Sequence, residues 1–442
     1  MLRQDGGLVT LATLLLDTQM RRHSCHSVPR AGVFVLILAL ASVGRAGAND
    51  MLHASSGAVL DSTGMPVELR CVNLSPWLEP EPYLIGKALR GLTRSPSQIK
   101  QRLADLIGPD EARDFWRRWQ AAFITEADFA RLNRQGFNCV RLPLNAKYIA
   151  ANAPDGSIAL DEAALAPVDH AVAWGAAHGI YVMLDLHAAF GGQNAVSTVA
   201  DMPSDDTVAR LWLGPDAAAN QRRTVALWHA LAARYANARS VGGYDLLNEP
   251  QLPAGVPKDA LPKLYDAISA AIRSVDPNHM LILEGDHYAH DFDSLPLPTD
   301  SNVMYEFHEY SLLNPTWREP NSKALAPFLQ LRASTGVPLW LGEFGEETQA
   351  WQAQMVQLME ANRIGWAIWP WKRIDLGNNH PVVEAIALPD AWEDLFKYLV
   401  GAWFAGKPSR EKAEQGMSQM LQAIRTENCT EDRRLLQALT AR

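Results

Sequence analysis

The sequence predicts an α/β fold in which eight strands and eight helices alternate and close into a (β/α)8 barrel, the TIM barrel. Eight short runs rich in Val, Leu, Ile and aromatic residues alternate with amphipathic runs, and this alternation is typical of a parallel sheet. Polar residues gather just after the apolar runs, as they do at the carboxyl ends of barrel strands. An open doubly wound sheet is the alternative, but it would carry a glycine-rich first turn, which is missing.

The eight predicted strands are short and bounded by turn residues. In chain order they are 67–74, 137–144, 180–187, 242–249, 279–285, 302–310, 337–344 and 364–371. The stretches between them have the apolar spacing of helices, among them 126–136, 168–179, 222–237 and 263–278. Several strands follow a helix that ends in Gly, the residue that most often ends a helix.

Two long insertions interrupt this alternation. Residues 86–122 separate the first strand from its helix, and Ser95, Pro96 and Gln98 form the start signal of a helix within them. We expect a helical flap on the face of the barrel where the strands end. Residues 188–220 form a long loop after the third strand, and the tail from about residue 407 is polar with a helical pattern.

The first 48 residues are typical of an export signal. Met20–Arg22 gives a positive start, 33–41 an apolar segment and 46–48 small residues before a cut ahead of Asn49. Met20 is then a candidate for the true start. The apolar run is short for a membrane span, so we expect a secreted or periplasmic protein without stable membrane insertion, an uncleaved anchor being the alternative. Residues 49–442 are expected to form a single catalytic barrel domain that includes the helical tail.

Charge and motifs narrow the classes of partner. The formal net charge is −9, and the chain beyond residue 48 is more acidic still because the first 48 residues carry five Arg and two Asp. An acidic chain argues against nucleic acid, which needs a basic surface. The spacing of His, Cys and Gly predicts no metal site and no cofactor. Cys71, Cys139 and Cys429 are expected to be buried thiols, with a Cys71–Cys139 bridge between neighbouring strands as the alternative.

The strand ends contain two carboxylates that together indicate glycoside hydrolysis. Glu249 follows the fourth strand and Glu343 ends the seventh, so a barrel would bring both to one cavity. Such a pair can protonate a leaving oxygen and attack the sugar or activate water. Other residues expected around the same cavity are Glu81, Arg141, His187, Asn248, His308, Tyr310, Trp369 and Trp371.

These neighbours suit the binding of a sugar beside an ionised nucleophile. Asn248 could hold a sugar hydroxyl, while Arg141 and Tyr310 could keep the nucleophile ionised and oriented. The chain has 14 Trp; Trp369 is the first choice for a sugar platform and Trp371, expected on the same strand face, the second. Nearby acids have structural interpretations: Glu346 and Glu347 as a solvated helix start, Glu284 and Asp185 as buried structural groups.

Seven segments in order resemble glycoside hydrolase family 5, the cellulase family of clan A: NLSPWLEPEPYL, GFNCVRLPLN, LDLHAAFGGQN, YDLLNEP, EFHEY, LGEFG and GWAIWPWK. The resemblance spans roughly residues 56–400. It implies a (β/α)8 barrel and retaining hydrolysis, with Glu249 as acid/base and Glu343 as nucleophile. It also implies site roles for the positions Arg141, His187, Asn248, His308, Tyr310 and Trp369.

The first-strand segment is similar to that of the exo-β-1,3-glucanase-like branch of the family. That similarity implies that Glu81 lies near the subsite for the glycone. The chain departs from the branch at Cys71 and at Ser75-Pro76, where the branch has Gly and Gly-Gly.

The leading hypothesis is a secreted retaining β-glycosidase that acts on a β-glucan or β-glucoside with β-1,3 or β-1,4 linkages. A second hypothesis keeps the barrel but changes the substrate to β-mannan or a glycolipid head group, which would need an apolar shelf beside the cleft. A third is a non-catalytic carbohydrate-binding barrel, which would need the aromatic residues but not both carboxylates. The expected partner is an oligo- or polysaccharide.

Overall fold

The computed structural model describes residues 50–87, 94–152, 158–377 and 380–440. All of them belong to one compact unit, Ala46–Arg442. The predicted signal segment, residues 1–48 with Met20, lies outside the described residues.

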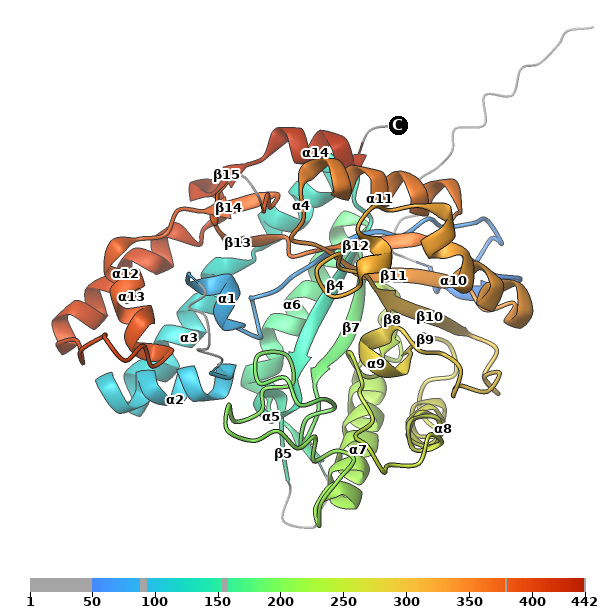
Figure 1. Cartoon of the computed structure of the whole chain (residues 1–442), viewed down its shortest axis with the longest axis horizontal. Coiled ribbons are helices and arrows are strands. Elements are labelled where there is room, and N and C mark those ends of the chain that lie inside the picture. The colour runs from blue at the N-terminus through green and yellow to red at the C-terminus, as the bar shows by residue number, and fades with distance from the viewer. Residues whose placement is uncertain (1–49, 88–93, 153–157, 378–379, 441–442) are drawn as a thin grey trace, which may run out of the picture. The chain divides into compact units, whose positions relative to one another are not determined.

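Eight parallel strands close into a barrel, which confirms the predicted fold (Figure 1). Around the barrel they follow the order of the chain, and the last pairs with the first. The strands are β3 (Arg70–Asn73), β4 (Cys139–Asn145), β7 (Tyr181–Ala188), β8 (Val241–Asp245), β9 (Met280–Glu284), β10 (Val303–His308), β11 (Leu339–Gly345) and β12 (Gly365–Trp369).

Helices connect the strands on the outside of the barrel, as crossovers between parallel strands require. They are α4 (Glu126–Gln135), α6 (Glu162–His178), α7 (Ala217–Tyr235), α8 (Ala260–Arg273), α10 (Ser322–Thr335) and α11 (Gln349–Ala361), with the short α1 (Pro82–Ile85), α5 (Ala146–Ile149) and α9 (Asp286–Ala289) in the loops. Helix α12 (Asp390–Leu399) follows the last barrel strand. The tail adds α13 (Arg410–Ala423) and α14 (Arg433–Thr440).

Short strands lie outside the barrel. The pairs β1 (His53–Ser55) with β2 (Ala58–Leu60) and β5 (Ala150–Asn152) with β6 (Ile158–Leu160) form two hairpin-like ladders. A third small sheet joins β13 (Lys372–Ile374), β14 (Glu384–Ile386) and β15 (Thr430–Glu431), and so ties the tail to the segment after β12. No helix among the described residues has both the length and the apolar character that crossing a bilayer requires.

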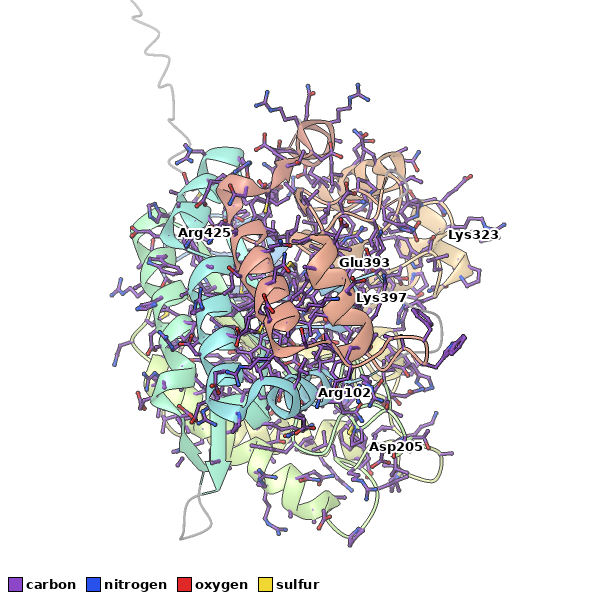
Figure 2. The ribbon with its side chains drawn as sticks, turned by 90° about the vertical axis from the view of Figure 1, so that its left-hand side faces the viewer. Arg102, Asp205, Lys323, Glu393, Lys397 and Arg425 are labelled. Carbon is purple, nitrogen blue, oxygen red and sulfur yellow. A yellow bond between two sulfur atoms is a disulfide. The ribbon has the colours of Figure 1, made fainter. Side chains whose placement is uncertain are left out.

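The first insertion begins a helix where the sequence predicts it, but the insertion is not a flap. Ser95 and Gln98 form a capping box at the start of α2 (Pro96–Ile107), which is followed by α3 (Pro109–Phe123). Both helices pack against α13 of the tail, and α2 also packs against α12. The Arg102 guanidinium of α2, labelled in Figure 2, donates to the Tyr398 carbonyl of α12 over 2.9 Å. The insertion therefore lies beside the barrel (Figure 1), where Phe115 and Trp119 of α3 stack on Trp392 of α12.

The amino-terminal half of the barrel interior is apolar and contains a disulfide. Cys71 of β3 and Cys139 of β4 are paired in register, with Cα atoms 4.4 Å apart, and are bonded to each other. The expectation of buried thiols is therefore wrong for this pair, because direct register neighbours lie within reach of a disulfide. Cys429 is a free thiol. Met183, Met304 and other apolar side chains fill the space around the disulfide.

Candidate active site

A cavity of about 210 Å³ opens where the barrel strands end. Several elements contribute side chains to it, because the carboxyl ends of all eight strands meet on this face. The residues that line it are Glu81, Tyr83, His187, Val199, Glu249, Tyr310, Leu312, Leu313, Glu343, Glu346, Glu347 and Trp369. Six of the ten predicted site residues are among them.

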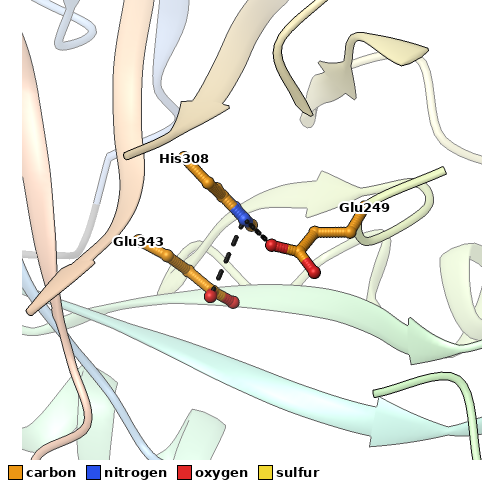
Figure 3. A group of neighbouring side chains, drawn as sticks. All are labelled: Glu249, His308 and Glu343. Carbon is orange, nitrogen blue, oxygen red and sulfur yellow. Dashed lines mark hydrogen bonds and ion pairs between the residues drawn. The ribbon is translucent and has the colours of Figure 1, made fainter. Parts of the chain in front are cut away.

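Glu249 and Glu343 face each other across His308 (Figure 3). His308 Nδ1 lies 2.9 Å from Glu249 Oε1 and 3.7 Å from Glu343 Oε2. A carboxylate oxygen of Glu249 lies within 4.8 Å of one of Glu343. The two carboxyl groups, predicted from segments almost a hundred residues apart, are thus brought to one point.

Glu343 receives two hydrogen bonds that favour its ionised form. Arg141 Nη1 donates to Oε1 over 2.7 Å, and the Tyr310 hydroxyl donates to Oε2 over 2.9 Å. The Arg141 guanidinium is fully buried. Burial opposes its charge, but Asp185, Glu306, Asp245 and Glu343 outweigh that effect and raise its pKa further. Hydrogen bonds to a carboxylate stabilise the charged state, as a nucleophile requires.

Glu249 lies in the opposite environment. Strand β8 ends at Asp245, so Glu249 belongs to the loop beyond it, where its φ of +47° is unusual for a residue with a side chain. Its backbone N–H donates to Glu284 Oε2 over 2.6 Å, which fixes this turn. Burial raises the pKa of the Glu249 carboxyl, with His187 the largest opposing influence. A raised pKa favours the protonated form that a general acid uses.

Asn248 and His187 present polar edges beside this pair. Asn248 Oδ1 accepts from Arg141 Nη2 over 2.8 Å, while the buried Nδ2 has no hydrogen-bond partner among the described residues. His187 stacks on Trp369 with ring centroids 5.4 Å apart, and its Nδ1 lies 2.8 Å from Asp185. Burial opposes a charge on His187, but Asp185 and Glu81 raise its pKa well above the ordinary value.

Glu81 and Trp369 form one wall of the cavity, and Trp371 does not. Burial raises the pKa of Glu81 to about 7, against the effect of His187. The Trp369 indole N–H donates to the Tyr83 hydroxyl over 2.9 Å. Trp371 is fully buried against Phe137, so the predicted sugar contact at Trp371 is wrong. Strand β12 ends at Trp369, and the alternation of faces does not continue past that residue.

Several residues of this region were not predicted as part of the site, among them Tyr83, Glu346 and Glu306. Tyr83 lies in the quoted first-strand segment, but its contact with Trp369 spans 286 positions and has no local signal. Glu346 lines the cavity with a φ of +56°, and α11 starts only at Gln349, so Glu346 and Glu347 are not a solvated helix start. Glu306 lies below the cavity, fully buried, on the same strand as His308.

Two sets of side chains bring possible metal ligands together. They are Glu249, His308 and Glu343, and Glu284, Glu306 and His308, with ligand atoms within 4.8 Å of one another in each set. A cation already serves both sets, because Arg141 lies 2.7 Å from Glu343, 3.2 Å from Glu284 and 3.1 Å from Glu306. Arg141 therefore supplies one positive charge that three of these four carboxyl groups share.

The chain is similar to known glycosidases in sequence and in fold. A family model described as cellulase (glycosyl hydrolase family 5) matches residues 105–374. A beta-xylosidase of Phanerodontia chrysosporium is 30% identical over 355 residues, which cover 73% of this chain and 71% of the relative. A probable glucan 1,3-beta-glucosidase A of Emericella nidulans is 30% identical over 59% of this chain and 62% of the relative, less than two thirds of that protein. The crystal structure of an endogalactoceramidase shares the fold, with a TM-score of 0.53 and 24% identity over 74% of this chain and 75% of the other.

Proposed function

The chain is a glycosidase that belongs to glycoside hydrolase family 5, and from this premise we propose that it is a secreted retaining β-glycosidase acting on a β-glucan or β-glucoside. In the first step Glu343 attacks the anomeric carbon while Glu249 protonates the leaving oxygen. In the second step Glu249 removes a proton from water, which attacks the glycosyl–enzyme bond and releases the sugar with retained configuration.

One observation carries the proposal: a carboxylate oxygen of Glu249 lies within 4.8 Å of one of Glu343. Retaining enzymes hold their carboxyl groups about 5–5.5 Å apart, whereas inverting enzymes need about 6.5–9.5 Å to fit a water between them. The different surroundings of the two groups support the assignment of roles. Arg141 and Tyr310 donate to Glu343, while burial raises the pKa of Glu249.

The size of the cavity favours a short glycone. About 210 Å³ is less than the roughly 300–1,000 Å³ of pockets that enclose drug-sized ligands. Glu81, the free Asn248 amide and the Trp369 ring would hold the sugar. Export of the enzyme is proposed from the signal pattern of residues 1–48.

The stereochemistry of the first product tests this proposal. Aryl β-glucoside, β-xyloside and β-mannoside would be incubated with the purified protein, with β-1,3- and β-1,4-glucans and mannan as polymers, and the anomer released first would be identified by proton NMR. We expect the β-anomer before mutarotation. Release of the α-anomer would exclude double displacement, and binding without hydrolysis across the panel would favour a carbohydrate-binding barrel.

A second candidate substrate, a glycolipid, is favoured by an apolar shelf at the cavity. Leu312 and Leu313 both line the cavity, yet they are 79% and 74% exposed. They follow β10 on the same face as the proposed acid/base, where the leaving group would lie. Exposed neighbouring apolar side chains commonly mark a site that binds an apolar partner, here the alkyl part of a glycoside.

Alkyl β-glucosides of increasing chain length separate the two candidates. If the shelf holds the aglycone, kcat/KM should rise about two- to fivefold for each methylene group until the shelf is covered. A Leu312→Ser, Leu313→Ser double variant should lose this dependence while it hydrolyses a methyl glucoside as before. A flat response of the unmodified enzyme to chain length would exclude the glycolipid version and leave the glucoside proposal intact.

A further inference from the structure

Glu306 is a buried carboxyl group that the proposed reaction does not use. It lies on β10, two residues before His308, so both side chains point to the barrel interior. Its side chain has no exposed area. Oε1 lies 3.1 Å from Arg141 Nε and 3.1 Å from His308 Nε2. Burial of a carboxyl group costs free energy that such polar partners offset, so these two contacts are what holds Glu306 in place.

The neighbouring strand leaves room for this carboxyl. A Cβ atom added at Gly342 would lie 1.5 Å from Glu306 Oε1, so any side chain at this position would displace it. Gly342 directly precedes Glu343 on β11. Because Gly342 has no side chain, the Glu306 carboxyl can occupy the space beside the proposed nucleophile and contact His308.

His308 links Glu306 to Glu249. Its Nε2 lies 3.1 Å from Glu306, and its Nδ1 lies 2.9 Å from Glu249. Burial lowers the pKa of His308 to about 3, against the effect of Glu343, so the ring is neutral at ordinary pH. A neutral imidazole has one N–H. It donates a hydrogen bond to one of the two carboxyl groups and accepts a hydrogen bond from the other, which must therefore be protonated.

We propose that Glu306 is a positioning residue that shares one proton with Glu249 through His308. This inference rests on the acid/base role proposed above for Glu249. In the first arrangement, the Glu306 O–H donates to Nε2, and Nδ1–H donates to the Glu249 carboxylate. In the second, the O–H bond of Glu306 and the Nδ1–H bond are broken, while Nε2–H and an O–H bond on Glu249 are formed. Both arrangements hold two protons and one negative charge.

The charges around Glu306 favour its protonated form in the first arrangement. Burial raises the pKa of Glu306 well above its usual range, and although Arg141 opposes this effect, nearby acids add to it. The charged groups that face it from the other strands are Arg141 of β4, Asp185 of β7, Asp245 of β8, Glu284 of β9 and Glu343 of β11. His290 also acts on His308 and lowers its pKa.

The shared proton would serve both steps of a double displacement. The second arrangement presents Glu249 as an acid to the leaving oxygen. When that proton departs with the leaving group, the three residues are left one proton short, and the water consumed in the second step restores it. Glu249 can therefore change between acid and base without exchanging a proton with bulk water.

The test is the pH profile of a Glu306→Gln variant. The amide fits the same space beside Gly342, but it can no longer deliver a proton to His308. Glu249 would then titrate against bulk solvent, and its pKa would fall. The first substrate is the methyl β-glycoside of the sugar that is cleaved fastest in the panel above. For this substrate we expect the basic limb of the kcat/KM profile to move about one pH unit lower. At pH values above the shifted limb, kcat/KM should therefore be about tenfold lower than in the unmodified enzyme. For the 2,4-dinitrophenyl β-glycoside, whose leaving group needs no proton, the loss should be under about threefold.

Glu284→Gln is the matched control on the next strand. Glu284 is equally buried and equally near Arg141, but it lies 3.6 Å from His308 Nε2 and bonds the backbone N–H of Glu249 instead. Whatever its effect on kcat, we expect its basic limb to stay where the unmodified enzyme has it. An equal shift in both variants, or a loss with Glu306→Gln that is the same for both substrates at every pH, would overturn the proposal.

Two further measurements keep the inference testable if Glu306→Gln does not fold. Nitrogen-15 NMR of His308 in the unmodified enzyme should show a neutral ring whose proton changes nitrogen when Glu343 is trapped with a 2-deoxy-2-fluoroglycosyl group. An imidazolium, or an unchanged tautomer, would overturn it. The Glu249→Ala variant distinguishes a failure of the proton-sharing proposal from a failure of the proposed function. If its loss of kcat/KM is the same for good and poor leaving groups, Glu249 is not the acid/base.

Discussion

The two halves of the barrel interior are built from the same strands but have opposite chemistry. On β9, Met280 and Ile282 lie in the apolar half, whereas Glu284 lies at the charged end. On β10, Met304 precedes Glu306 and His308 in the same way. All of these side chains are buried. The amino-terminal half can therefore be held by packing alone, while the carboxyl-terminal half depends on the balance of charges around one guanidinium.

The largest expected effect is on kcat, which should fall for a substitution in the charged half and not for one in the apolar half. Glu343→Ala removes the proposed nucleophile from the charged half and should lower kcat by about 10⁴-fold or more, measured on an aryl β-glucoside. Met304→Leu changes the shape of the apolar half at similar volume and should leave kcat within about twofold. Circular dichroism would check that both variants are folded. A Glu343→Ala protein with the unmodified rate on every substrate would end the assignment of Glu343.

The next largest effect is a loss of stability when the Arg141 guanidinium is removed. Arg141 is an ion-pair partner of Asp185, Asp245, Glu284, Glu306 and Glu343, all within 3.2 Å. Replacing it with Met leaves buried carboxylates without a counter-charge, which costs about 3–5 kcal/mol of unfolding free energy. Urea unfolding at neutral pH would measure this loss. Met304→Leu should cost less than about 1.5 kcal/mol. An equal loss in the Arg141→Met and Met304→Leu variants would contradict the proposed difference between the two halves.

The sequence predicts the residues at the charged rim of the barrel better than it predicts the buried groups beneath that rim. Glu249 and Glu343 could be predicted because each follows an apolar run, and strand ends in a barrel converge. Glu306 could not be assigned, because alternation shows only that it shares a face with His308 and not which group it meets. The Cys71–Cys139 bond depends on a register between strands 68 residues apart in the chain. Trp371 was misplaced because the strand ends two residues earlier than its apolar pattern.

The disulfide tests the apolar half without touching the proposed chemistry. Replacing Cys71 and Cys139 together with Ala should lower the unfolding free energy by about 2–4 kcal/mol, because the bond closes a long loop in the unfolded chain. The value of kcat should not change, since both residues lie at the apolar end. Cys429→Ala, which removes the free thiol, should have an effect within about 0.5 kcal/mol. A fall in kcat that matches the fall in stability would show that the halves are coupled.

The smallest effect is the contribution of the charged half to the pH dependence of stability. Burial raises the pKa of Asp245 and of Glu81 to about 7, and it raises the pKa of Glu79, a buried residue in the loop between β3 and α1, to about 8. A carboxyl with a raised pKa in the folded state contributes fully below its unfolded pKa, and that stability is lost as the pH rises through the folded value. His308, with a pKa lowered to about 3, acts in the opposite sense only below its unfolded value of about 6.5.

Between pH 6.5 and 8 the carboxyl groups therefore act without that opposition, and the unfolding free energy should fall. Each group contributes at most about 1.4 kcal/mol per pH unit. Asp245→Asn should flatten the curve, because an amide does not ionise, whereas Met304→Leu should shift the curve without changing its slope. Urea unfolding at half-unit steps of pH would measure both. Equal slopes in the Asp245→Asn variant and the unmodified protein would mean that this carboxyl is already ionised in the fold, and that Arg141 balances more charge than the contrast between the halves assumes.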